Sequence, residues 1–127
     1  MLITTTDSVE GYPVERYLGL VTGEAVCGIS IFSDIKAGFK DMVGGRVESY
    51  EKELESAKNN AMIEMIKEGE ILGAHAIVGV DIDYMEFLGK YLMVVMNGTA
   101  VQLKDFQAKQ MPDNFMMPVE KPNSDKR

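Results

Sequence analysis

One stretch of this chain, residues 17–54, constrains the fold more than any other. It reads YLGLVTGEAVCGISIFSDIKAGFKDMVGGRVESYEKEL. Its apolar start predicts a strand over residues 15–28, and the glycines within that strand indicate a bulge or bend instead of a flat central strand. Apolar residues at helical spacing then predict a helix that begins near Ser30 or Ser33 and ends at Gly44 and Gly45. A strand and a helix are therefore followed by a glycine break and a second helix.

The second helix is predicted from Ser49 to about Leu72, with Gly73 as its C-cap. Gly69 lies inside this span and indicates fraying or a break, because glycine destabilises a helix interior by about 1 kcal/mol relative to alanine.

Three further apolar segments complete the expected fold. Residues 76–87 and 91–103 predict two strands of an antiparallel hairpin around a turn at residues 88–90. The β-branched run over residues 2–6 predicts a short strand at a sheet edge. The expected fold class is therefore α+β, a small β-α-β-β subunit whose antiparallel sheet packs on two helices.

The second hairpin strand also predicts assembly. Residues 91–96 are apolar on both faces of the strand, whereas an antiparallel sheet usually exposes one face to water. Two helices cover only one face of so small a sheet, so the other face requires another copy of the chain, and we expect a ring-shaped homo-oligomer. The alternative is a monomer whose second face is covered by the N-terminal segment or the C-terminal tail.

Composition excludes several classes of function. The 127 residues suffice for one domain, and 46% hydrophobic with 26% charged residues is typical of a globular protein. The net charge of -7 argues against a nucleic-acid partner, which would require a basic surface. No segment approaches the roughly 20 apolar residues of a membrane span, and no signal-like start is present. With Cys27 as the single cysteine, we expect a cytoplasmic protein without a membrane partner.

The last 21 residues differ from the rest of the chain. Residues 107–127 contain three of the four prolines and end in charged and polar side chains, so they predict a flexible tail after a domain of residues 1–106. The apolar island at residues 114–117 is either incidental or docks on a neighbouring subunit.

Five sequence blocks carry a resemblance to a known family. In chain order they are GLVTGEA at 19–25, DMVGGR at 41–46, YEKEL at 50–54, GVDIDY at 79–84 and GTAV at 98–101. Together they resemble the YbjQ-like family over most of residues 1–104. The resemblance implies a dodecin-like subunit assembled as a homopentamer or a pair of pentameric rings. It implies little chemistry, because the family is described as uncharacterised or "putative heavy-metal-binding".

Strand alternation provides the first candidate metal ligands. His75, Ile77, Gly79, Asp81 and Asp83 share one parity, and we expect them to point away from the helices. Asp81 and Asp83 then lie about 7 Å apart, where they contribute to a site that neighbouring subunits complete. The alternative is a pair of solvated acids that keeps this face soluble or forms salt bridges at an interface.

Cys27 and His75 are the remaining candidate ligands, because thiolate and imidazole suit soft or borderline metals. The predicted metal ligands are therefore Cys27, His75, Asp81 and Asp83, for a divalent or heavy-metal ion. The alternative gives Cys27 the role of a small buried hydrophobe and His75 that of a helix cap or surface group.

Other features of the sequence carry weaker signals. The methionines are better explained as core residues than as copper ligands. Gly44, Gly45 and Arg46 suit either an anion or a tight helix connection, and Glu24 suits a subunit junction or an exposed edge. No nucleophile is paired with a base, so we predict no enzyme, and the absence of tryptophan disfavours a flavin site. The function predicted from sequence is a homo-oligomeric metal-binding protein; the alternative is a structural or partner-binding ring, or a small-ligand binder without metal.

Overall fold

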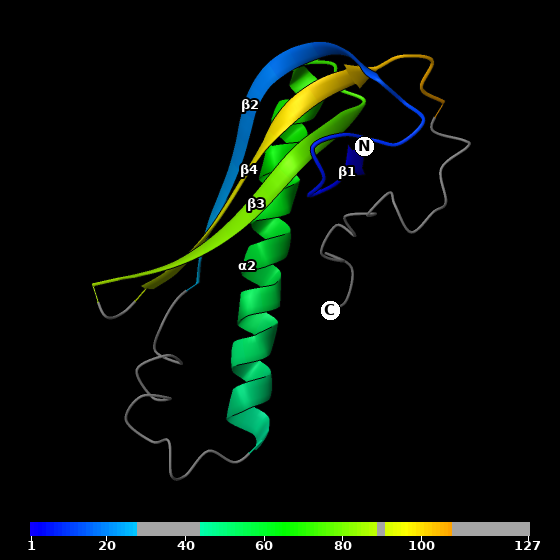
Figure 1. The fold of residues 1–127 in the computed structure, drawn as a ribbon. Coiled ribbons are helices and arrows are strands. Elements are labelled where there is room, and N and C mark those ends of the chain that lie inside the picture. The colour runs from blue at the N-terminus through cyan, green and yellow to red at the C-terminus, as the bar shows by residue number, and fades with distance from the viewer. Residues whose placement is uncertain (28–43, 89–90, 108–127) are drawn as a thin grey trace, which may run out of the picture.

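The computed structural model describes residues 1–27, 44–88 and 91–107 (Figure 1). The elements in these residues are β1 (Leu2–Ile3), β2 (Val14–Cys27), α2 (Gly44–Ile71), β3 (Ala76–Phe87) and β4 (Tyr91–Leu103). The hairpin β3–β4 and the long strand β2 confirm the sequence prediction. The helix expected before Gly44 and the tail from residue 108 lie outside the described residues.

The sheet is mixed, which corrects the expected antiparallel sheet. Its strand order is β1-β3-β4-β2. β4 pairs antiparallel with β2 and with β3, but the short β1 runs parallel to β3, with Leu2 opposite Ala76. β1 lies on the far side of β3 from β4, at the edge of the sheet.

Helix α2 covers one face of the sheet (Figure 1), and it corresponds to the second of the two helices predicted from the sequence. It begins at Gly44, so the glycine pair forms its first residues and does not precede it. It continues through Gly69, where a break was expected. A Cβ added at Gly69 would lie 3.2 Å from Ile77 Cδ1, so a small residue lets the helix approach the sheet. Gly73, with φ +77°, follows the helix as predicted and donates its N–H to the Glu70 carbonyl at 3.0 Å.

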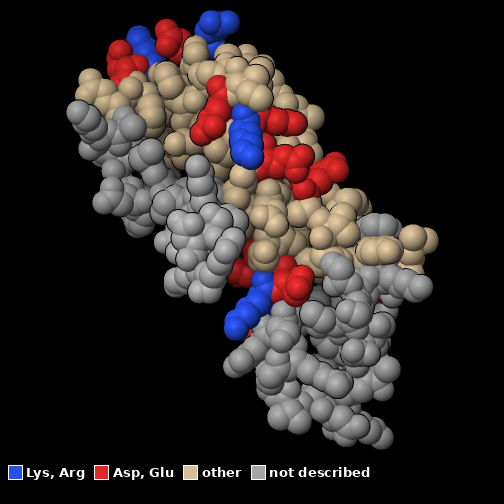
Figure 2. Space-filling view, turned by 180° about the vertical axis from the view of Figure 1, so that it is seen from behind, with Lys and Arg blue, Asp and Glu red and all other residues tan. Residues whose placement is uncertain are grey.

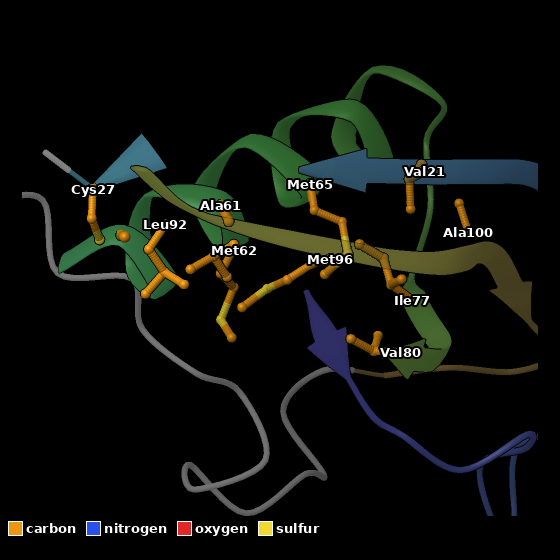
Figure 3. Packing of buried hydrophobic residues seen from close by; sticks show 12 residues of the cluster. Val21, Cys27, Ala61, Met62, Met65, Ile77, Val80, Leu92, Met96 and Ala100 are labelled. Atoms are coloured by element: carbon orange, nitrogen blue, oxygen red, sulfur yellow. The ribbon is translucent and has the colours of Figure 1, made fainter. Parts of the chain in front are cut away.

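The main core lies between α2 and the sheet (Figure 3). Its helix side is built from small and flexible residues, which let the helix lie close to the strands. Methionines contribute much of its volume, in agreement with their interpretation as core residues. The buried residues of this cluster are Val21, Cys27, Ala57, Ala61, Met62, Met65, Ile77, Val80, Leu92, Val94, Met96 and Ala100.

A bulge in β3 overturns the predicted parity before Gly79, whereas Asp81 and Asp83 face away from α2 as predicted. The register with β4 shifts between Val78 and Asp81, and Gly79 adopts φ +61°. Ile77 therefore faces α2, whereas Asp81 lies on the opposite face, although the two residues have the same parity in sequence. Simple alternation fails here because a bulge inserts one extra residue.

The face opposite α2, called the open face below, is covered only at one end within the described residues. There the N-terminal segment packs on a second buried cluster, to which Val9, Tyr12, Val14 and Phe106 contribute partly buried side chains. The buried members of this cluster are Leu2, Ala76, Val78, Val101 and Leu103. The alternative of a covering N-terminal segment is thus correct for this end. The rest of the face exposes Leu20 (74% of its surface) and Val26 (54%).

Candidate functional site

Cys27 ends β2 on the helix side of the sheet and is buried. Its thiol donates to the backbone carbonyl of Glu53 at 3.4 Å. Burial raises the pKa of the Cys27 thiol, and the charge of Glu53 raises it further. Because the thiolate is the form that binds metals, this environment disfavours metal binding at Cys27.

His75 lies between α2 and β3 and holds the chain against the end of β4. Its N–H donates to the Val101 carbonyl at 2.9 Å, and its Nδ1 accepts the N–H of Leu103 at 3.0 Å. Its ring stacks on Phe106 with a centroid distance of 5.4 Å. An Nδ1 acceptor assigns the proton to Nε2. A metal at Nε2 would move that proton to Nδ1 and break the bond to Leu103, so the geometry suits a cap better than a ligand.

Asp81 and Asp83 lie side by side on the open face, and both are exposed. The charge of Asp81, together with a hydrogen bond between the two side chains, raises the pKa of Asp83 above its ordinary value. The carboxylates are thus close enough to repel each other, and a cation would relieve that repulsion.

The fold separates the other two candidates from this pair. Cys27 pairs with Leu92 at one end of β4, and His75 bonds to Val101 at the other. At about 3.3 Å per residue these two positions are roughly 30 Å apart. One chain therefore brings together only the two aspartates, and the described residues contain no group of three or more His, Cys, Asp or Glu placed to hold a metal ion.

Strand register places further oxygen donors beside the aspartates. Thr22, Asn97 and Asp81 form one row across β2, β4 and β3, and Glu24, Val95 and Asp83 form the next. Thr22 Oγ1 donates to Asn97 Oδ1 at 3.3 Å. We call Asp81, Asp83, Glu24, Asn97 and Thr22 the carboxylate patch. Sequence analysis missed Thr22 and Asn97, because only the register across three strands brings them to the aspartates.

Apolar rows border the carboxylate patch at both ends. Leu20 lies in register with Thr99 on one side, and Val26, Met93 and Met85 form a row on the other. Leu20, Val26 and Met85 are exposed. Exposed apolar side chains therefore lie on both sides of the carboxylate patch, and such exposed apolar surface can mark a contact with another protein.

The opposite side of the molecule differs from the open face in how its charged side chains are arranged. On the side that Figure 2 shows, acidic side chains form separate groups, each beside a basic side chain. A small cleft of about 210 Å³ is lined by Glu51, Leu54, Glu55, Lys58 and Tyr84. Lys58 Nζ lies 4.0 Å from Glu55 Oε2, so the cleft already contains its own counter-charge. No helix within the described residues is long and apolar enough to span a membrane.

Comparisons with known proteins agree on one family. The model of the YbjQ family, described as "Putative heavy-metal-binding", matches residues 1–104. A "UPF0145 protein" of Bifidobacterium longum subsp. infantis is 52% identical over 106 residues, covering 81% of this chain and 96% of the relative, and one from Bifidobacterium longum strain DJO10A matches equally. A solved structure of a DUF74-family protein of unknown function from Pediococcus pentosaceus has a TM-score of 0.52 at 20% identity, covering 81% of this chain and 97% of that one. At that identity the structural match supports the fold alone.

Proposed function

The chain belongs to the YbjQ-like family, and on that premise we propose that it is a homo-oligomeric, non-enzymatic protein that binds a metal ion at the carboxylate patch of its open face. The observation that carries this proposal is the Asp81–Asp83 pair. The charge of Asp81 raises the pKa of Asp83 on an exposed face, so a cation bound between the two carboxylates would take the place of that proton.

The donors of the patch indicate which metal it would bind. Carboxylate, amide and hydroxyl oxygens suit hard cations such as Ca²⁺ or Mn²⁺ better than soft metals. Two carboxylates do not fill six or more coordination positions, so Glu24 or side chains of a neighbouring subunit would complete the site. In this proposal Cys27 and His75 have structural roles.

Support for assembly comes from the open face. A two-layer domain buries only one face of its sheet, and the other face here carries the exposed apolar residues Leu20, Val26 and Met85. A second copy would cover these rows, and a ring, with a pentamer as the first expectation, would repeat the carboxylate patch at each junction. A cytoplasmic location belongs to the same proposal and is supported by the single, reduced Cys27.

Calorimetric titration of metal-free protein with Mn²⁺, Ca²⁺ and Zn²⁺ tests the metal site. The variant Asp81→Asn/Asp83→Asn should bind the metal at least about tenfold more weakly, because each lost charged ligand typically contributes more than about 1.4 kcal/mol to the binding free energy. Cys27→Ala, His75→Ala and the remote control Asp7→Asn should bind as the wild type does. If Cys27→Ala or His75→Ala abolishes binding and the double variant does not, the proposed site is wrong.

Light scattering across a range of protein concentrations tests assembly separately. Leu20→Glu should lower the mass, because it places a charge in the apolar border of the open face. Ile71→Glu is the matched control, since Ile71 is equally apolar and 85% exposed but lies at the end of α2. A wild-type monomer at micromolar concentration would contradict the proposal. Assembly without metal binding would favour the second function, a structural or partner-binding ring, which the apolar borders also support.

A further inference from the structure

The outer edge of β2, with which no described strand pairs, carries a contact that the proposed function does not use. β2 lies at one edge of the sheet and is 14 residues long. An unpaired strand edge presents N–H and C=O groups to which a strand of another chain can bind. On β2, two of these donors already have partners. Thr22 N–H donates to Glu68 Oε2 at 2.9 Å, and Glu24 N–H donates to Glu64 Oε2 at 3.4 Å.

The close approach of α2 brings these two carboxylates to the edge. Between the two N–H groups lies Gly23, and a Cβ added there would overlap the Ala61 carbonyl and lie 2.8 Å from Met65 N. Glycine at this position therefore lets the backbone of α2 touch β2. Glu64 and Glu68 then project from consecutive turns of the helix on its β2 side.

The spacings of the two elements match. Residues four apart on a helix are separated by about 6 Å along its axis, and residues two apart on a strand by about 6.7 Å. Two carboxylates at i and i+4 on α2 can thus meet two successive edge N–H groups of β2. One such contact could arise by chance, but two in register form a repeated pattern.

We propose that Glu64 and Glu68 form an intramolecular cap that closes the middle of the β2 edge to strand addition by a second copy of this chain. A second copy is the partner whose strand we expect to pair with this edge, because β2 is long and presents the exposed apolar side chains of Leu20 and Val26. The cap leaves the open face free for the proposed assembly, and it acts whether or not that assembly forms.

Amide hydrogen exchange of the folded protein, resolved by residue with NMR, tests the cap. Glu68→Ala should accelerate exchange at Thr22 about tenfold and leave Glu24 unchanged, while Glu64→Ala should do the reverse. Glu68→Gln and Glu64→Gln retain an oxygen acceptor and should stay within about threefold of the wild type. Glu70→Ala, an exposed glutamate of the same helix, controls for general loosening. Acceleration at every amide, or at neither Thr22 nor Glu24, would overturn the cap.

The consequence for association needs a second measurement. Glu64→Ala/Glu68→Ala should form species of higher mass than the wild type as concentration rises, with increased thioflavin T fluorescence. Glu64→Gln/Glu68→Gln should retain the wild-type mass. If the double alanine variant frees both amides yet keeps the wild-type mass at all concentrations, the contact does not protect the edge and the proposal is wrong.

Discussion

Replacing Gly23 by alanine tests most directly how α2 is held on the sheet. The added Cβ would overlap the carbonyl oxygen of Ala61 and lie 2.8 Å from both the Ala61 carbonyl carbon and Met65 N. These are backbone atoms of a helix, so no side-chain rotation relieves the clash. The helix would have to move by roughly 1.5–2 Å before all of these contacts approach the roughly 3.5 Å of ordinary packing.

The expected loss of stability follows from three contributions. Overpacking at a site that cannot relax costs about 3 kcal/mol, the upper end of the usual range. Moving α2 also lengthens the bonds from Thr22 and Glu24 to Glu68 and Glu64, each of which contributes about 0.5–1.5 kcal/mol. Alanine loses less backbone entropy on folding than glycine does, which offsets about 0.5–1 kcal/mol of this loss. The net destabilisation of Gly23→Ala should therefore be about 3–5 kcal/mol.

Urea unfolding followed by far-UV circular dichroism at one fixed protein concentration measures this value. Gly69→Ala is the matched control, because its Cβ would meet only side-chain ends, at 3.2 Å from Ile77 Cδ1 and 3.3 Å from Met1 Cε. There the gain of about 1 kcal/mol in helix propensity offsets mild crowding, so stability should change by less than about 1 kcal/mol. A Gly23→Ala variant within about 0.5 kcal/mol of the wild type would refute the close contact between α2 and β2.

Three further predictions concern the candidate ligands. His75→Ala should destabilise the fold by about 1–3 kcal/mol, because it leaves the Leu103 N–H without its acceptor. His75→Asn keeps an acceptor near the position of Nδ1 and should lose less stability in the same urea assay. The pKa of Asp83 is higher in the folded than in the unfolded state, so the Asp81–Asp83 pair destabilises the fold at pH values above the folded pKa. This destabilisation disappears as the pH falls below the unfolded pKa, where both states bind the proton. Asp81→Asn should return the pKa of Asp83 toward its ordinary value in an NMR titration of the carboxyl carbons. The buried Cys27 thiol should react with a disulfide reagent at least about a hundredfold more slowly in native protein than in urea, and equal rates would contradict its burial.

The elements were predictable where the hydrophobic pattern is regular. The bounds of β3 and β4 follow from apolar alternation between turn residues, and Gly73 marks the end of α2 as helix capping requires. Gly69 was misinterpreted because propensity describes an isolated helix, whereas tertiary contact with Ile77 decides this position. The bulge at Gly79 escaped the prediction because alternation assumes that every residue of a strand is paired.

The candidate site was less predictable than the fold. Asp81 and Asp83 are close in sequence, so their exposure on the open face followed from alternation within one short segment. Whether Cys27 and His75 meet depends on which ends of β4 they adjoin, which is a matter of register between distant strands. The edge contacts of Glu64 and Glu68 were also invisible in the sequence, because a solvated helix face has the same pattern.

The proposed function implies that metal binding and assembly at the open face would be coupled. Its apolar rows favour contact with a second copy, but Asp81, Asp83 and Glu24 would bring uncompensated negative charge into that contact. Burying such charges costs several kcal/mol unless a cation or a basic side chain of the neighbour pairs with them. A metal that binds only the assembled form must stabilise it by the linkage relation. We therefore expect chelation to lower the mass of the wild-type assembly in light scattering. Asp81→Asn/Asp83→Asn should assemble in the presence of chelator, because it retains Leu20 and Val26 and lacks the repulsion; failure of that variant to assemble under these conditions would contradict the coupling.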